Sequence, residues 1–187
     1  MVPILTADSS TTTEDLNPLI ERFLLRCRAP IRAIGGHSAL LVSPEGITAK
    51  IFFQVGDHRA QVEQDAFGLI QSSQSRSPYI AQCFLSRPDI TFMPFISDKN
   101  LHNHVAMVNR PPPVFTWMFQ LSSAATVLET IGLAHGDIKP HNILVDERDN
   151  LTLIDLDHTL PIGSDLEVGD EPYVRAHTLG ESGECTA

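Results

Sequence analysis

The chain has 187 residues, of which 42% are hydrophobic and 19% are charged, and its formal net charge at pH 7 is −10. This composition can fill a core, so it argues for a globular domain rather than a disordered chain. The acidic excess argues against a general nucleic-acid-binding protein, which would present a basic face.

The cysteines and the first residues bear on location. Cys27, Cys83 and Cys185 lie far apart and show neither a zinc-binding spacing nor the paired framework typical of secreted proteins. The start, MVPILTADSSTTTEDL, lacks the basic and apolar regions of a signal peptide. No run approaches the ~18 apolar residues of a membrane helix. We expect a cytoplasmic or nuclear protein with no membrane and no nucleic-acid partner.

The first half of the chain predicts a short helix and then a small sheet. Residues 1–14 are rich in Ser and Thr, and we expect them to be flexible. Apolar residues from Leu16 to Leu24 recur at helical spacing, and Pro30 ends this pattern. Residues 58–71 predict a second helix. Five short β-rich segments are separated by turn signals, at residues 31–36, 38–42, 47–53, 80–85 and 89–96.

The second half predicts helices and one hairpin. Residues 100–108 predict a short helix, which three prolines at 111–113 end. From Val114 to Leu128 apolar residues recur every three or four positions, which predicts an amphipathic helix with Val114, Trp117 and Met118 among its inward residues. The segments ILV and LTLI predict a hairpin around a polar turn at 146–150, and the tail from residue 176 is expected to be frayed.

A polar stretch, HGDIKPHNILVD at 135–146, precedes the turn of this hairpin. Phosphoryl transfer needs a carboxylate to accept the proton of the attacking hydroxyl, a cation near the phosphoryl group, and oxygen ligands for Mg²⁺. Asp137 can be the catalytic carboxylate and Lys139 the cation. Asn142 and Asp155 offer the oxygen ligands that Mg²⁺ prefers.

This stretch, followed by L-I-D-L-D, resembles the catalytic loop and metal-binding strand of the eukaryotic protein kinases. Lys139, within D-x-K-x-x-N, is typical of the serine/threonine branch, and short divergent kinases of fungi often carry H-G-D-I-K-P. The resemblance covers roughly residues 31–175 and implies an α+β, two-lobed kinase-like fold, with ATP and Mg²⁺ between a small β-rich N-lobe and a mainly helical C-lobe. The expected organisation is a flexible N-terminus, an N-lobe with its preceding helix, a partial C-lobe and a frayed tail, at residues 1–14, 15–95, 96–175 and 176–187.

The resemblance also implies ATP-binding residues upstream. Lys50 matches the strand lysine that binds the α- and β-phosphates, and Glu63 matches the helix glutamate that holds this lysine, with Asp65 as the alternative. Gly35 and Gly36 stand where a glycine-rich loop would cover the phosphates, although G-x-G-x-x-G is incomplete and a plain hairpin turn fits equally well. Met93, in F-M-P-F, falls where a kinase chain passes the adenine.

Three departures from the kinase pattern affect the prediction. Gly136 replaces the arginine before the catalytic aspartate, which removes the usual anchor of a phosphorylated activation loop. Asp157 replaces the glycine of D-F-G, either as a second metal ligand or, as we favour, as a cap of the turn. The chain ends before the helical subdomain that supports a kinase catalytic loop. The C-lobe is then incomplete, and a partner or a second copy would cover its apolar surface.

We therefore expect an ATP-dependent serine/threonine protein kinase that acts on protein hydroxyl groups. The alternative is a kinase-like binding module without turnover, which the incomplete glycine loop and the incomplete C-lobe favour. A small-molecule phosphotransferase of the aminoglycoside-kinase type also uses H-G-D, but Lys139 argues against it. The small kinase of the tRNA-modifying KEOPS complex commonly lacks a lysine at that place, and it stays a minor variant.

Overall fold

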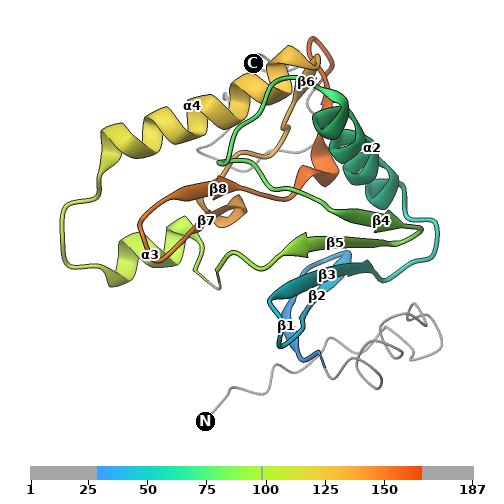
Figure 1. The fold of residues 1–187 in the computed structure, drawn as a ribbon, viewed down its shortest axis with the longest axis horizontal. Helices are drawn as coiled ribbons and strands as arrows, with labels where there is room; N and C mark the ends of the chain where they lie inside the picture. The colour runs from blue at the N-terminus through green and yellow to red at the C-terminus, as the bar shows by residue number, and fades with distance from the viewer. Residues whose placement is uncertain (1–28, 98, 166–187) are drawn as a thin grey trace, which may run out of the picture.

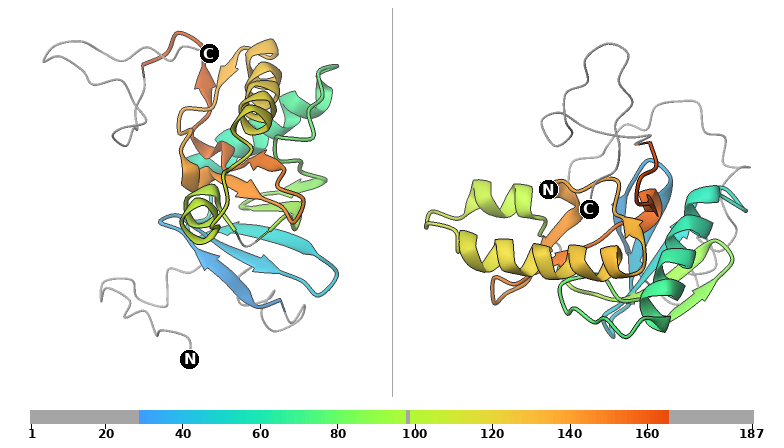
Figure 2. Two further views of the ribbon diagram at one scale, coloured as in Figure 1. Left: turned by 90° about the vertical axis from the view of Figure 1, so that its left-hand side faces the viewer. Right: turned by 90° about the horizontal axis from the view of Figure 1, so that it is seen from above.

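A computed structural model describes residues 29–97 and 99–165, which form an α+β fold (Figure 1). It contains a five-stranded antiparallel sheet, three α-helices and two two-stranded ladders. The predicted helix at 16–24, the N-terminal segment 1–14 and the tail 176–187 lie outside the described residues. Figures 1 and 2 show the large sheet at one end of the molecule and the longest helix at the other.

The large sheet contains the first five strands in the order β1-β2-β3-β5-β4. Its strands are β1 (Ile31–Ile34), β2 (Ser38–Val42), β3 (Ile47–Phe52), β4 (Leu85–Arg87) and β5 (Ile90–Pro94). The central strand β3 is buried along nearly its whole length, as expected for a strand covered on both faces. Lys50 is therefore a charged residue in the most buried strand of this sheet, and it needs partners.

The predicted strand at 80–85 is wrong in position. Ile80 forms an isolated parallel bridge with Leu153, and the backbone N–H of Ala81 donates to the Leu153 carbonyl at 2.8 Å. The paired strand begins only at Leu85. This segment thus hydrogen-bonds to the second half of the chain, a long-range contact that local strand propensity does not show.

Helix α2 (His58–Ser72) confirms the helix predicted at 58–71. The side chain of Asp57 accepts a hydrogen bond from the backbone N–H of Arg59 and caps the first turn. One face is buried, made of Ala60, Glu63, Ala66, Phe67 and Ile70. A glutamate in the middle of this apolar face again requires a partner.

The second half contains the remaining elements. The predicted helix at 100–108 and the hairpin are confirmed. The elements are α3 (Leu101–Met107), α4 (Val114–Thr130), β6 (Leu133–Ala134), η1 (Pro140–Asn142), β7 (Ile143–Val145), β8 (Leu151–Leu153), η2 (Leu156–His158) and β9 (Leu160–Pro161). Strand β8 packs against α4, and α2 packs against η2. None of the helices within 29–97 and 99–165 is long and apolar enough to cross a membrane.

Two apolar clusters form the core. The smaller one lies in the large sheet and includes Leu41 and Ile51. The larger one joins α2, α4 and the β7–β8 hairpin through Phe67, Leu128 and Leu153. A five-stranded sheet with α2 is compatible with a small kinase-like N-lobe, whereas the division into lobes at 15–95 and 96–175 stays a prediction.

Helix α4 is present as predicted, and its buried face agrees with the prediction in part, because Trp117, Ala124 and Leu128 are buried. Val114 and Met118 are exposed, as are Phe115 at 90% and Phe119 at 68%. The buried face instead includes Gln120, whose amide oxygen accepts from the Leu151 N–H at 2.8 Å and whose amide nitrogen donates to Asn150 at 3.0 Å. A glutamine that bonds the hairpin is thus part of the buried face of a helix whose first two turns are apolar on several sides.

The substitution Leu153→Ala tests the packing of strand β8 in the larger apolar cluster. Leu153 is 0% exposed, and its truncation leaves a cavity in the larger cluster. We expect a loss of ~2–5 kcal/mol in the free energy of unfolding, measured by urea titration. Leu69→Ala on α2, where the side chain is 44% exposed, is the matched control and should change stability little. Equal losses would contradict the described packing.

Candidate active site

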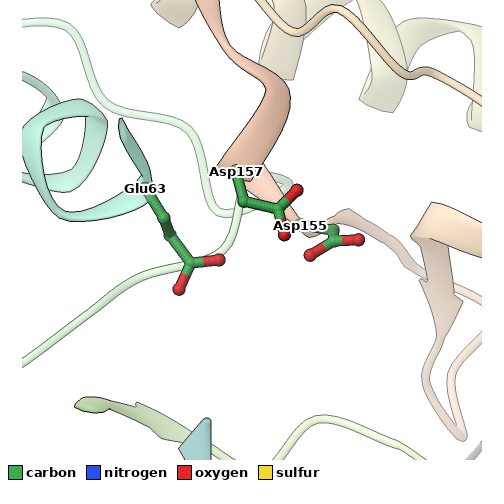
Figure 3. Close-up of side chains that lie close together, drawn as sticks. All are labelled: Glu63, Asp155 and Asp157. Atoms are coloured by element: carbon green, nitrogen blue, oxygen red, sulfur yellow. The ribbon is translucent and has the colours of Figure 1, made fainter. Parts of the chain in front are cut away.

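Lys50 lies at the centre of a cluster of carboxylates. Lys50 is 5% exposed. Its Nζ donates to Glu63, to Asp155 Oδ1 at 2.6 Å and to Asp157 Oδ2 at 3.3 Å. Glu63 comes from α2, Asp155 follows β8, and Asp157 lies in η2, and Figure 3 shows the three carboxylates close together. One ammonium group therefore joins three separate elements.

A left-handed turn brings the two aspartates to the same lysine. Asp155 has φ 68° and ψ 67°, a backbone conformation that aspartate adopts more readily than most residues other than glycine. The chain leaves the line of β8 at this point and enters η2, where Leu156 is fully buried. The turn returns Asp157 towards Lys50, so both side chains contact the same Nζ.

The charges of the cluster influence one another. Burial alone would lower the pKa of Lys50, but the three carboxylates outweigh it and raise this pKa above its ordinary value. Burial would raise the pKa of Asp155, but Lys50 holds it below its ordinary value. Burial raises the pKa of Glu63, because one ammonium shared among three carboxylates does not offset it. Lys50 is therefore a stable cation at neutral pH.

A second group of polar side chains lies in the HGDIKPHN stretch. Asp137 is buried, and its Oδ2 contacts Lys139 Nζ at 3.0 Å and accepts from Asn142 Nδ2 at 2.8 Å. Asn142 Nδ2 also donates to the Asp137 carbonyl at 3.0 Å. Because the amide nitrogen of Asn142 faces Asp137, its amide oxygen is the end that a cation could use.

Backbone hydrogen bonds tie this stretch to the residue before Asp155. His135 Nε2 donates to the Ile154 carbonyl at 2.9 Å, and its Nδ1 accepts from the Asp137 N–H at 3.3 Å. This pattern requires a neutral ring, and burial lowers the pKa of His135. The Ile154 N–H donates to the Asn142 carbonyl at 2.9 Å. Asp137 and Asp155 are thereby held on neighbouring, mutually bonded segments.

Gly136 occupies a place that no other residue fits. Its φ is +78°, and a Cβ atom there would lie 2.1 Å from the His158 carbonyl oxygen. Both the backbone conformation and the contact with the backbone require glycine. The absence of arginine before Asp137 is therefore a consequence of local geometry.

The remaining predicted residues lie elsewhere. The Gly35 N–H donates to the Ser38 carbonyl at 2.8 Å, so Gly35 and Gly36 form the turn between β1 and β2. Met93 is half-buried in β5 and packs against the larger core cluster. Among the described residues, none of these three shares a side-chain hydrogen bond or ion pair with the Lys50 cluster. Asp65 is exposed and accepts from Gln61 at 2.7 Å, which leaves Glu63 as the acidic residue of α2 that contacts Lys50.

Sequence reasoning missed two features of this region. Asp157 does not cap the turn as we favoured, because its carboxylate contacts Lys50 and, at 2.7 Å, His158 Nδ1. In addition, two buried side-chain oxygens in the described part of the chain have no hydrogen-bond partner, Glu63 Oε1 and Thr91 Oγ1. Thr91 lies directly opposite Lys50 in the β3–β5 pair. Only the D-x-D spacing offered a signal in the sequence; the place of Thr91 depends on strand register.

These residues fit a hard divalent cation. Asp155 and Asn142 offer the carboxylate and amide oxygens that Mg²⁺ prefers. Glu63, Asp155 and Asp157 each offer one oxygen, and these oxygens lie within 4.8 Å of one another. The donor set contains oxygen atoms only, which favours Mg²⁺ or Mn²⁺ over softer metals.

Comparison with known proteins gives a limited result. No protein-family model matches the chain. A stretch of 62 residues is 38% identical to the probable serine/threonine-protein kinase FMP48 of Saccharomyces cerevisiae. This stretch is 32% of the present chain and 17% of the yeast protein, so the chain spans only a small part of that relative. The similarity weakly supports a kinase-like character.

The close approach at Gly136 can be tested with Gly136→Ala. The left-handed backbone alone costs ~1–2 kcal/mol, and the collision of Cβ with the His158 carbonyl should add at least ~1–3 kcal/mol. Gly132→Ala is the matched control, because Gly132 has φ +79° and open space around its Cβ position. Urea unfolding of both variants measures the difference, and equal losses would show that the contact is not tight.

Proposed function

We propose that the chain transfers the γ-phosphate of ATP to serine or threonine hydroxyl groups of proteins. The observation that carries this proposal is the buried Lys50, held between Glu63 and Asp155. The residue before Asp155 is hydrogen-bonded to the loop that contains Asp137. The partial similarity to a probable serine/threonine kinase supports the same class.

Lys50 and Glu63 would serve the nucleotide. A charged ammonium can stabilise the α- and β-phosphates, and its carboxylate partner keeps it in place. Gly35, Gly36 and Met93 would lie over the phosphates and beside the adenine, as the resemblance implies. These three assignments stay predictions.

Asp137 and Lys139 would serve the transfer itself. The hydrogen bond from Asn142 orients the Asp137 carboxylate, which can accept the proton of an attacking hydroxyl. Lys139, 3.0 Å away, places a positive charge beside it that can stabilise the migrating phosphoryl group. Bound Mg²⁺ would neutralise charge on the phosphates, with Asp155 and Asn142 as the residues that hold it.

A kinase-like binding module without turnover is the second candidate. It is favoured by the exposed turn at Gly35–Gly36 and by the bonding of Lys50 to Asp155 and Asp157 as well as Glu63. The predicted partner or second copy on the second half of the chain also stays a prediction. The exposed residues Phe115 and Phe119 of α4 are a surface on which it could lie.

The first test is transfer of labelled γ-phosphate from Mg-ATP to mixed serine and threonine peptides. Asp137→Asn keeps the shape of the side chain but removes its basicity, so we expect a fall in rate of at least ~10²-fold. Glu147→Gln removes one exposed carboxylate and is the control, with no change in rate expected. Absence of transfer by a folded wild-type chain would contradict the proposal, and nucleotide binding without transfer would favour the binding module.

A second test separates the two acidic residues of α2. Glu63→Gln removes the charge that contacts buried Lys50, and a charge-assisted hydrogen bond contributes ~1.5–3 kcal/mol. We expect the KM for ATP to rise about tenfold or more. Asp65→Asn, on the exposed side of the same helix, should leave this KM unchanged. A larger effect of Asp65→Asn would assign the lysine-binding role to Asp65.

A further inference from the structure

The Lys50 cluster contains more negative than positive charge. Three carboxylates surround one ammonium, and two of them, those of Glu63 and Asp157, are buried. His158 contacts Asp157 at 2.7 Å, but counting it as a cation still leaves three negative charges against two positive ones. Buried charge without a full complement is costly. A cation would balance this cluster.

An independent observation points to the same place. Glu63 is almost fully buried, and its Oε2 bonds Lys50, but its Oε1 has no hydrogen-bond partner. A buried carboxylate oxygen without a donor requires an explanation, and a bound ion or an ion-bound water provides one. Glu63 belongs to the same group of oxygens as Asp155 and Asp157.

The geometry suits a small divalent cation. The oxygens of the three carboxylates lie within 4.8 Å of one another, and two oxygens on opposite sides of Mg²⁺ are about 4.2 Å apart. Asp155 and Asp157 lie on one turn, side by side in Figure 3. A small side-chain adjustment would place both on one ion.

We propose that Asp155 and Asp157 together bind a divalent cation of the Mg²⁺ or Mn²⁺ class in the absence of nucleotide. The cation takes the place of Lys50 at the two aspartates, and Lys50 keeps its bond to Glu63. The proposed kinase function needs only Asp155 and Asn142 as ligands, so Asp157 is the new assignment. The inference rests on the proposed function in one respect only, which is the location of the phosphates. Once Lys50 no longer bonds the two aspartates, its ammonium group is available to bind those phosphates.

The test is titration of the full chain with Mn²⁺ in the absence of nucleotide. Electron paramagnetic resonance measures the concentration of unbound Mn²⁺ at each step. We expect one Mn²⁺ per chain, with binding at least tenfold weaker in Asp157→Asn and unchanged in Glu147→Gln. Added Mg²⁺ should compete with Mn²⁺ and should raise the unfolding temperature of the wild type more than that of Asp157→Asn.

Two results would overturn the inference: no Mn²⁺ binding by the folded wild-type chain, or equal binding by Asp157→Asn. Asp157→Glu, which retains a carboxylate, should keep measurable binding, and it is the conservative control for Asp157→Asn. The outcome is separable from that of the kinase assay. If the chain transfers phosphate but does not bind Mn²⁺ in the absence of nucleotide, this inference alone is contradicted. If the chain binds Mn²⁺ but does not transfer phosphate, the kinase function alone is contradicted.

Discussion

The ammonium group of Lys50 is the interaction on which the arrangement of this protein depends. It connects the central strand of the sheet, helix α2 and the turn after β8, which are distant in sequence. Loss of one partner from a buried ion pair costs ~3–5 kcal/mol, because the other charge remains buried. The same contacts place an acidic turn beside the sheet, so one side chain links the packing of these elements to the chemistry of the site.

Local sequence patterns correctly predicted the elements that depend mainly on residues close together in the sequence. Helix α2, helix α3 and the β7–β8 hairpin follow from spacing, caps and turn residues. The errors concern contacts between distant segments. The strand expected at 80–85 bonds β8 instead, and α4 has its Phe115 side exposed and Gln120 on the side that bonds the hairpin. Hydrophobic periodicity records how apolar a face is, and it does not identify the neighbour of that face.

The same distinction applies to the candidate site. The sequence allowed the Lys50–Glu63 pair to be predicted, and a polar loop with fixed spacing indicated Asp137 and Asn142. It favoured a capping role for Asp157, because only the left-handed turn at Asp155 directs this carboxylate to Lys50. It gave no indication of Thr91, whose place opposite Lys50 is set by strand register. Such placements depend on backbone turns and pairing that residue identities alone do not determine.

The tight contact at Gly136 has a consequence for the descent of this chain. Because the His158 carbonyl occupies the space of a side chain at position 136, the two segments cannot change independently. An ancestor or a descendant with arginine there would need a different path for the backbone near residue 158. A change from glycine to a larger residue at position 136 therefore requires a coordinated change near residue 158.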